Sequence, residues 1–546
     1  MIDLEREFNY LHLAGLLAGI LGLSIALAHY VIAFGKNYAS IPDVEKVFKI
    51  PILGHSPFIR QGDGFLAQFV EAAKENNRKF PGLGKALIWF SPFNPVYFVF
   101  NAKAAKEVLT QKKWNNKGFF YKFLHDWLGT GLLTSNGDKW KTRRRMLTPA
   151  FHSKILNDFT EVMNKHMRVM TKIIYDEIKN SPNGVAEIDI LRKFTLSTLD
   201  IICDTAMGKH ISSQLNPDHE YVQAIYAETF MAQTRQVNFA LWTDSAFKML
   251  QPDTYKKHHS LLKILKDFTM GIIKDRIQEA EDLKQQKEGE GNDAIETETG
   301  GERKKLAFLD VLLQNYENNE IDLEGIREEV ETFMFEGHDT TSSALSFMSY
   351  LLAENGKTCE KLQNELDEKL TFLDTKEDFY TNVDRFEVTN TDYDRMVYTD
   401  YSAREALRMF PPVPLITRQD RVKGNPLFSI NNLILGIYQI GRDEEAWQKA
   451  HEFIPERWAE DGSSPVNNAM RDNAFSWIPF SAGSRNCIGQ RFAMMEIKVA
   501  IAFMFKFFKF ENVVSRQELE DNLQADIILR PKDTLMLKVS LRDEYK

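Results

Sequence analysis

The chain opens with a long hydrophobic stretch, because residues 8–34 contain no Asp, Glu, Lys or Arg. As an α-helix this stretch would be about 40 Å long, enough to cross a hydrocarbon layer of about 30 Å. It therefore predicts a single membrane anchor at residues 1–34. A cleaved signal peptide is the alternative, and Ala26-Leu27-Ala28 has the composition of a cleavage site. The acidic residues before the run and the length of the run favour the anchor.

The residues that follow this stretch predict its orientation and a linker. Three lysines lie between residues 36 and 49, and an excess of positive charge marks the cytoplasmic side of a membrane span. Three prolines between residues 42 and 57 predict a stiff linker over residues 35–60. We therefore expect the rest of the chain, residues 61–546, to lie in the cytosol.

Helical spacing of apolar residues dominates most of the remaining chain. Apolar residues alternate at Val96–Phe100 and predict a strand, whereas residues 221–276 have the pattern of amphipathic helices. Residues 323–353 read as one unbroken helix, and residues 285–305 are charged and Gly-rich, which predicts a disordered surface loop. An aromatic run at residues 114–127 either lines a pocket or packs in the core. The pattern predicts a mainly α fold with a small β portion.

Composition narrows the class of protein. The chain has 546 residues, enough for one large domain or several smaller ones, and 43% of them are hydrophobic. A formal net charge of −9 argues against a nucleic-acid partner. Its three cysteines are far apart and odd in number, which excludes a disulfide framework and fits a reducing compartment.

The most specific chemistry lies near the C-terminus, around Cys487. Gly483 and Gly489 flank this cysteine, Phe480 precedes it by seven residues and Arg485 by two, and a helix-forming run follows. Glycines let the backbone approach a flat ligand, and amides at a helix start favour a thiolate. Such a thiolate can be the axial ligand of a haem iron. A lone cysteine is more often buried and inert, but here five positions in ten residues are specified together.

The pattern F-x-x-G-x-R-x-C-x-G resembles the haem-binding loop of the cytochrome P-450 family, and three further motifs follow the order of that family. The resemblance covers about residues 40–540. It implies a cytochrome P-450 fold behind the N-terminal transmembrane helix, with residues 61–546 forming the haem-binding monooxygenase domain. The implied cofactor is haem b bound through Cys487, with Phe480, Gly483, Arg485 and Gly489 in the same loop.

The second motif lies in the middle of the long predicted helix. Thr hydroxyls in a helix can bond to the carbonyl four residues earlier, so Gly337 and the pair Thr340-Thr341 predict a local bulge or kink. Within the family, Asp339 and Thr340 form an acid–alcohol pair that delivers protons during O₂ activation. Without Cys487, ordinary helix packing would be the preferred interpretation.

Glu336 lies on the same helix face as Thr340, where many family members have a small residue. A charged and unpaired glutamate in an apolar pocket would cost several kcal/mol. Residues 333–341 closely resemble the fatty-acid ω-hydroxylase branch, in which this glutamate forms an ester with a haem methyl. The hypothesis is therefore that haem b is ester-linked through Glu336.

The third motif and one separate arginine imply contacts with the haem propionates. Trp140 and Arg144 are four residues apart and can reach one ligand from a shared helix face. Arg418, on a predicted strand, matches a family arginine that also reaches a propionate. Arg143 and Arg145 are expected to point to solvent.

The remaining motif is structural. Glu405 and Arg408 match the family's E-x-x-R pair, for which Arg457 is the expected third partner. This region also departs from the family, because Gly441-Arg442-Asp443-Glu444 lacks the usual histidine and proline. Since that histidine normally helps to hold a propionate, haem binding there is expected to be weaker.

The resemblance implies insertion of one oxygen atom from O₂ into a C–H bond of a lipophilic substrate. The branch suggests ω-hydroxylation of fatty acids or related lipids, by an enzyme of the endoplasmic reticulum membrane. No G-x-G-x-x-G fingerprint occurs, so electrons are expected from an NADPH-dependent flavoprotein reductase. Four basic residues are candidates for docking this partner, with ordinary solvation as the alternative: Lys141, Arg143, Arg491 and Lys498.

Two other functions remain open. One is a haem-thiolate isomerase or peroxygenase that needs no reductase, against which the intact Asp339-Thr340 pair argues. The other is a non-catalytic protein that binds haem or lipid. Reductase-dependent turnover distinguishes both from a monooxygenase.

Overall fold

The computed structural model describes residues 63–91, 94–289, 308–370, 376–420 and 432–545, with a few single positions outside these ranges. The predicted anchor and linker fall almost entirely outside the described residues. Among the residues that are described, no helix has both the length and the apolar composition needed to cross a membrane.

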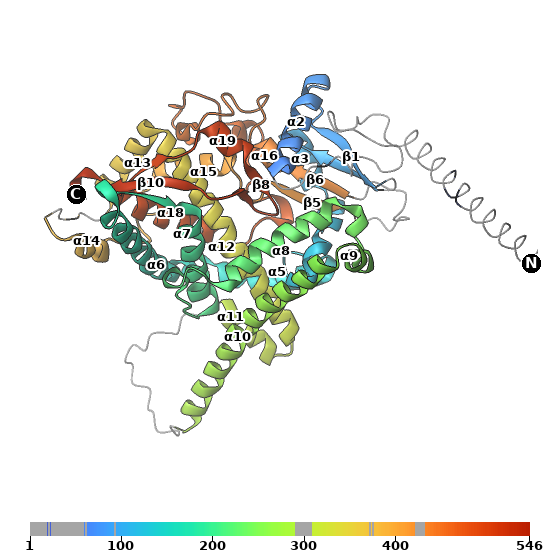
Figure 1. Ribbon diagram of the computed structural model, residues 1–546, viewed down its shortest axis with the longest axis horizontal. Helices are drawn as coiled ribbons and strands as arrows, with labels where there is room; N and C mark the ends of the chain where they lie inside the picture. The colour runs from blue at the N-terminus through green and yellow to red at the C-terminus, as the bar shows by residue number, and fades with distance from the viewer. Residues whose placement is uncertain are drawn as a thin grey trace, which may run out of the picture.

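The described chain is mainly helical, as the sequence predicts, and Figure 1 shows the helices packed around the central α12 with α10 extending beyond the body. The helices are α2 (Asp63–Lys79), α3 (Ala102–Leu109), α4 (His125–Leu128), α5 (Gly137–Leu147), α6 (Ser153–Lys179), α7 (Ile190–Ile202), α8 (Glu220–Val237), α9 (Asp244–Leu250), α10 (Pro252–Gly289), α11 (Phe308–Glu317), α12 (Leu323–Glu354), α13 (Gly356–Lys369), α14 (Phe379–Arg385), α15 (Val397–Met409), α16 (Ile437–Ile440), α17 (Ala469–Asp472), α18 (Gln490–Phe507) and α19 (Arg516–Asp521).

In the part of the chain that the structure describes, the strands form three small sheets, and the one that contains β1 lies at one side of the helical body (Figure 1). The largest has the order β1-β2-β6-β5-β3 and includes one parallel pair, β2 with β6. The others are β4-β10-β7 and the pair β8-β9. Their bounds are β1 (Lys85–Ser91), β2 (Asn94–Val99), β3 (Asn116–Lys117), β4 (Val185–Asp189), β5 (Leu415–Gln419), β6 (Asn432–Gly436), β7 (Phe508–Asn512), β8 (Leu523–Ala525), β9 (Leu529–Pro531) and β10 (Met536–Leu541).

The long helix α12 is the centre of the fold and confirms the predicted helix at residues 323–353. Asp322 caps its start by accepting a hydrogen bond from the backbone N–H of Gly325 at 2.8 Å. Apolar residues occur on all sides of the helix, and most of its length is buried against α7, α15 and α18. Gly337 is required here, because a Cβ at this position would lie 2.7 Å from the side chain of Ile202 on α7.

Two sequence predictions about the helices need correction. The prediction for the middle of α12 was a bulge or a kink. The helix is α-helical throughout, so the bulge does not form, although the Thr340 hydroxyl does donate to the carbonyl of Glu336 at 2.7 Å; the kink stays a prediction. The loop predicted from residue 285 begins too early, since α10 continues to Gly289. Charged residues on an exposed helix give no apolar periodicity, which is why the sequence pattern missed this last turn. The rest of that predicted loop lies outside the described residues.

Candidate active site

A large cavity with mainly apolar walls lies between α12 and the loop before α18. About 1310 Å³ of empty space lies within it, a volume that includes space open to solvent. Eight of the eleven site residues predicted from the sequence line it, namely Trp140, Arg144, Glu336, Thr340, Phe480, Arg485, Cys487 and Gly489. Asp339, Arg418 and Gly483 are not among the lining residues.

The Cys487 loop is held in a tight conformation before α18. The backbone N–H of Cys487 donates to the carbonyl of Phe480 at 2.9 Å, which closes the loop on itself. Gly483 has φ +74°, and a Cβ there would meet the carbonyl oxygen of Leu109 at 2.7 Å. Gly483 is therefore needed for the turn and for close packing against α3. A Cβ at Gly489 would lie 3.9 Å from Cys487 Sγ, an ordinary contact distance, so Gly489 lies beside the sulfur without being required there.

The Cys487 thiol has an unusual environment. The residue lines the cavity and retains accessible surface. Burial raises the pKa of the thiol to about 12, and the nearby carboxyl of Glu336 contributes in the same direction. The N–H of Gly489 and the charge of Arg144 oppose this shift without cancelling it. The amides near the helix start therefore do not by themselves ionise the sulfur, and a thiolate here needs a cation bound directly to it.

Three cations line the cavity, and we call Lys117, Arg144 and Arg485 the cationic wall. None of the three forms an ion pair within the described part of the chain. Arg485 donates to the carbonyl oxygens of Leu133 and Ser135, at 3.2 and 2.9 Å. Lys117 donates to the Tyr121 hydroxyl at 3.3 Å. These neutral acceptors satisfy the donors and leave the positive charge uncompensated.

Burial together with mutual repulsion shifts the titration of the cationic wall. Burial, then the charge of Arg418, lowers the pKa of Arg485 to about 9. Burial and the charges of Arg418 and Arg485 lower the pKa of Lys117 well below its usual value. Burial raises the pKa of Glu336, an acid that also lines the cavity, although Lys117 and Arg485 counteract this shift. The wall therefore favours binding of additional negative charge.

Helix α5 supplies Trp140 and Arg144, as predicted. The guanidinium of Arg485 stacks on the Trp140 ring, with its carbon 4.6 Å from the ring centroid. Arg144 donates to the backbone oxygen and side-chain oxygen of Asn486, at 2.8 and 3.0 Å, and so ties α5 to the Cys487 loop. The prediction for Arg145, which is exposed, is confirmed. The prediction for Arg143 is wrong, because this side chain is buried with its Nε 3.6 Å from Glu329 Oε1 on α12.

On α12, Glu336 and Thr340 face the cavity, whereas Asp339 points to the far side of the helix. Asp339 is fully buried and forms an ion pair with Arg530 on β9, whose Nε lies 3.3 Å from Asp339 Oδ1. Arg530 also stacks over the ring of Tyr226 at 4.2 Å. The structure therefore places the two members of the predicted acid–alcohol pair on different faces of one helix.

Arg418 lies on β5, as predicted, just behind the cavity wall. It is 2% exposed and donates to the hydroxyl of Ser481, a lining residue, at 3.1 Å. Burial lowers the pKa of its guanidinium. Arg418 therefore adds to the positive potential of the cationic wall without itself lining the cavity.

The E-x-x-R interpretation is confirmed, and we call Glu405, Arg408 and Arg457 the buried frame. The Glu405 carboxylate accepts from Arg408 at 2.9 and 3.0 Å and from Arg457 at 3.2 Å. The indole N–H of Trp458 donates to the same carboxylate at 3.1 Å. All three frame side chains are fully buried, and they connect α15 to the segment that leads into the Cys487 loop.

The departure at residues 441–444 has a steric basis. A Cβ at Gly441 would lie 2.2 Å from the carbonyl oxygen of Arg408, so no side chain fits at this position. Arg408 itself donates to the carbonyl oxygen of Gly441 at 2.6 Å. The missing histidine is thus replaced by a direct backbone contact with the buried frame.

The sequence did not identify Lys117 or Arg530, and it left open whether Tyr121, in the aromatic run, lines a pocket; the structure places Tyr121 in the cavity lining. Lys117 and Tyr121 lie in or beside the aromatic run at residues 114–127, most of which is core rather than cavity lining. A lone lysine among aromatic residues has no motif, and only the fold shows that it faces the cavity. Tyr121 also lines a second hollow of about 680 Å³, together with Phe65, Leu124, Leu415 and Ile527. Both hollows share Tyr121 and Val413, which makes the second a natural extension of the first.

The residues present fit an iron porphyrin. The cavity offers one thiol for a metal, walls that are mainly apolar, and the three cations of the cationic wall, which have no ion-pair partner among the described residues. A flat apolar ring with two carboxylates matches each of these features, because the carboxylates would neutralise the wall. These features together define a haem-thiolate protein.

Comparison with known proteins agrees with this class. A profile of the Cytochrome P450 family matches residues 45–539, and the chain belongs to that family. Cytochrome P450 4V2 of Rattus norvegicus is 36% identical over 510 residues, covering 92% of this chain and 90% of that protein. Cytochrome P450 4V2 of Homo sapiens is 35% identical over 531 residues, covering 95% and 94%. Cytochrome P450 4c3 of Drosophila melanogaster is 37% identical over 455 residues, covering 82% and 80%.

The predicted resemblance to family 4 is thereby confirmed. The chain is an oxidoreductase of the monooxygenase type whose cofactor is haem b. It uses O₂ and a substrate that carries an oxidisable C–H bond.

Proposed function

We propose that this protein hydroxylates the terminal or near-terminal carbon of long-chain fatty acids or related lipids. The observation that carries the proposal is a pair of adjoining apolar spaces: the cavity at Cys487 shares Tyr121 and Val413 with a second hollow, and both have mainly apolar lining. A long unbranched chain would occupy such a space end-on, with its methyl end toward the sulfur. The likeness to family 4 members supports the same substrate class.

In this proposal Cys487 would bind the iron of haem b, and the haem would supply the chemistry that activates O₂. Lys117, Arg144 and Arg485 would hold the two propionates, with Arg418 adding positive potential from behind the wall. Trp140 stacks against Arg485 and fixes the orientation of its guanidinium. Phe480 and Gly489 would contact the haem, and Gly483 fixes the turn that presents the sulfur.

Proton delivery is assigned to Thr340. Its hydroxyl donates to the Glu336 carbonyl, so its lone pairs remain free to accept from water in the cavity. Asp339 acts from the far side of the helix, where it is held by Arg530. In our proposal Asp339 positions this turn of α12 through Arg530, and it relays a proton only when the ion pair opens.

The ester at Glu336 remains part of the proposal. Burial favours the neutral form of the Glu336 carboxyl, and an ester is permanently neutral. A covalent link would also fix the ring relative to the terminal carbon of the substrate. Extraction with acidic organic solvent tests this point: the haem should stay with wild-type protein after turnover and leave the Glu336→Ala variant. Release of intact haem from the wild type would contradict the ester.

The membrane anchor at residues 1–34, the linker at 35–60, the endoplasmic reticulum location and the NADPH-dependent flavoprotein reductase complete the proposal. The decisive experiment is a product screen with purified protein and reductase, using fatty acids of increasing length. We expect hydroxylation at the terminal carbon that requires both NADPH and reductase. Product formed with peroxide alone and not with reductase would identify a peroxygenase, and oxidation confined to internal carbons would contradict the proposed selectivity.

A further inference from the structure

A cluster of three potential metal ligands lies outside the haem cavity, where α6 meets the end of α7. It contains His166 on α6, Asp204 in the turn after α7, and His210 in the next loop. One ligand atom from each residue lies within 4.8 Å of the others. Gly208 ends the turn in the left-handed conformation, with φ 66°, and this reversal brings His210 back over Asp204.

The distances within the cluster suit a tetrahedral ion. His166 Nε2 lies 3.0 Å from Asp204 Oδ2, and His210 Nδ1 lies 3.5 Å from the same oxygen. For zinc, with bonds of about 2.0–2.1 Å, the edge of a regular tetrahedron is about 3.3 Å. Two of the three edges therefore already have suitable lengths. The third can close by a small movement of His210, whose side chain is 51% exposed.

The surroundings of His210 match a second feature of metal sites. A ligating histidine usually directs its other ring nitrogen to a hydrogen-bond partner, which fixes the orientation of the ring. The Nε2 of His210 lies 2.9 Å from the hydroxyl of Ser212. Nδ1 is the nitrogen that faces Asp204, so the ring is already oriented with its ligand atom inward. The His166 ring is buried, which limits its motion.

We propose that His166, Asp204 and His210 form a binding site for a divalent transition-metal ion, with zinc as the best-fitting ion. Two imidazoles and one carboxylate are ligands that zinc accepts readily, and water would take the fourth position. The ion would join α6, the end of α7 and the following loop. The site is separate from the cavity, although Ile202, two residues before Asp204, lines the cavity wall.

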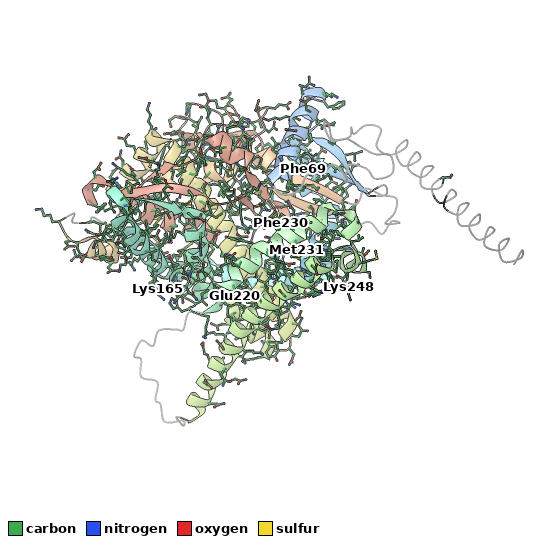
Figure 2. All side chains as sticks on the ribbon, viewed as in Figure 1. Phe69, Lys165, Glu220, Phe230, Met231 and Lys248 are labelled. Atoms are coloured by element: carbon green, nitrogen blue, oxygen red, sulfur yellow. The ribbon has the colours of Figure 1, made fainter. Side chains whose placement is uncertain are left out.

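Lys165 provides a way to distinguish this proposal from an ordinary polar network. Its Nζ lies 3.0 Å from Asp204 Oδ2, and Figure 2 shows Lys165 at the edge of the molecule. In a network without metal, Lys165 is simply one of the partners of Asp204. At a metal site it is a competitor, because its ammonium occupies the oxygen that the ion needs. Removing it has opposite consequences in the two cases.

The test uses the haem-loaded protein, carrying no polyhistidine tag, in competition with a chromophoric chelator for Zn²⁺. We expect wild-type protein to take up one ion that His210→Ala binds at least about 100-fold more weakly, and Ser212→Ala about tenfold more weakly. Lys165→Ala should bind more tightly than wild type. His451→Ala is the matched control, because this exposed histidine also pairs with a carboxylate, Glu444, but has no third ligand among the residues that the structure describes; its affinity should equal that of wild type.

Two results would overturn the proposal. One is equal zinc binding by wild type and His210→Ala, which includes the case in which neither binds. The other is weaker binding by Lys165→Ala, which would show that the lysine supports the cluster rather than competing for it. Because His210 and Lys165 are both on the surface, neither substitution removes core packing, and the outcome does not depend on the haem site.

Discussion

The buried frame and the cationic wall both contain buried cations, but within the described residues only those of the frame are paired with a carboxylate. In the frame, Glu405 accepts from both arginines, and Arg408 also donates to the carbonyl oxygens of Gly441 and Ala450 at 2.6 and 2.7 Å. The wall has its donors satisfied by neutral oxygens and its charge uncompensated. A buried network in which every charge is paired stabilises the fold without any ligand. A cluster of cations that lack a carboxylate partner is costly to bury, and an anionic ligand removes that cost by binding there.

The pair Arg143–Glu329 is an intermediate case. Glu329 accepts from the N–H of Leu132 at 2.9 Å, but its Oε1 and the Nη1 of Arg143 have no hydrogen-bond partner within the described residues. Burial raises the pKa of the Glu329 carboxyl to about 7. The charges are thus fully paired in the buried frame, partly paired at Arg143–Glu329 and, as far as the structure describes the chain, without a carboxylate partner in the cationic wall. We expect these three groups to respond differently when a charge is removed.

The largest effect is expected in the buried frame. Glu405→Gln places an amide where the carboxylate accepts from Arg408, Arg457 and Trp458, and leaves two buried cations uncompensated. Breaking a buried pair in this way costs about 3–5 kcal/mol, a large part of the ~5–15 kcal/mol that stabilises a typical protein. Chemical denaturation should show a fall in the free energy of unfolding of this size. Glu452→Gln is the control: its side chain is exposed, so a change above about 1 kcal/mol there would contradict the comparison.

The cationic wall should respond in the opposite way. Lys117→Met removes a buried unpaired charge, so the haem-free protein should unfold at the same or a higher denaturant concentration. Haem should leave the holoprotein about 10- to 100-fold faster, because a hydrogen bond between charged groups contributes about 1.5–3 kcal/mol. Transfer of haem to an excess of an acceptor protein measures this rate.

The exposed Lys122 serves as the control for the wall, since it lies on the same segment. Lys122→Met should change neither the haem release rate nor the stability of the haem-free protein. If Lys117→Met destabilised the haem-free protein and left haem release unchanged, Lys117 would belong to the fold and not to the binding site.

The pair Arg143–Glu329 predicts that the free energy of unfolding depends on pH. In the folded chain the pKa of the Glu329 carboxyl is about 7, whereas its ordinary value is 4.5. The stability that this group contributes is therefore complete below about pH 4.5 and is lost as the pH rises through 7. Relative to Glu329→Gln, the wild type should lose about 2 kcal/mol of unfolding free energy between pH 5 and pH 8. The exposed Glu360→Gln should show no such difference, and a pH-independent gap for Glu329→Gln would contradict the assignment.

The smallest effect concerns surface charge. Of the four basic residues predicted to dock a reductase, Lys141 and Arg491 are exposed, whereas Arg143 is buried and Lys498 pairs with Asp400 at 3.1 Å. Arg491→Glu should slow reduction by the flavoprotein about two- to tenfold at low salt, with a smaller effect at high salt. Lys248→Glu, an exposed position on α9, should leave the rate unchanged. Equal slowing by both variants would show that overall charge, and not a docking site, sets the rate.

The sequence could predict the parts of the site that short motifs specify. Cys487, Arg485 and Thr340 fall in motifs with several fixed positions, and the i, i+3 spacing of Glu405 and Arg408 requires a shared helix face. Helix α12 was predictable because its apolar run is long.

The remaining features depend on contacts between segments far apart in the chain. Lys117 faces the cavity only because β3 pairs with β5, and Asp339 turns from the cavity because β9 presents Arg530. Arg143 is buried because α5 packs close to the start of α12, near Gly325. The spacing of residues within one segment does not predict contacts with distant segments, so the basic face of α5 was predicted to be exposed to solvent. In the same way, the sequence shows only that Gly441 stands where the family has a histidine, whereas the structure shows that the carbonyl oxygen of Arg408 leaves no room for a side chain there.

The central claim is that the sulfur of Cys487 binds the haem iron, and the absorption spectrum of the reduced protein with carbon monoxide tests it most directly. Wild type and the Cys359→Ser control should show the strongly red-shifted Soret band of a thiolate-ligated haem, and Cys487→Ser should lack it. If Cys487→Ser kept this band together with its oxygenating activity, the ligand would be another residue and the account of the site would be wrong.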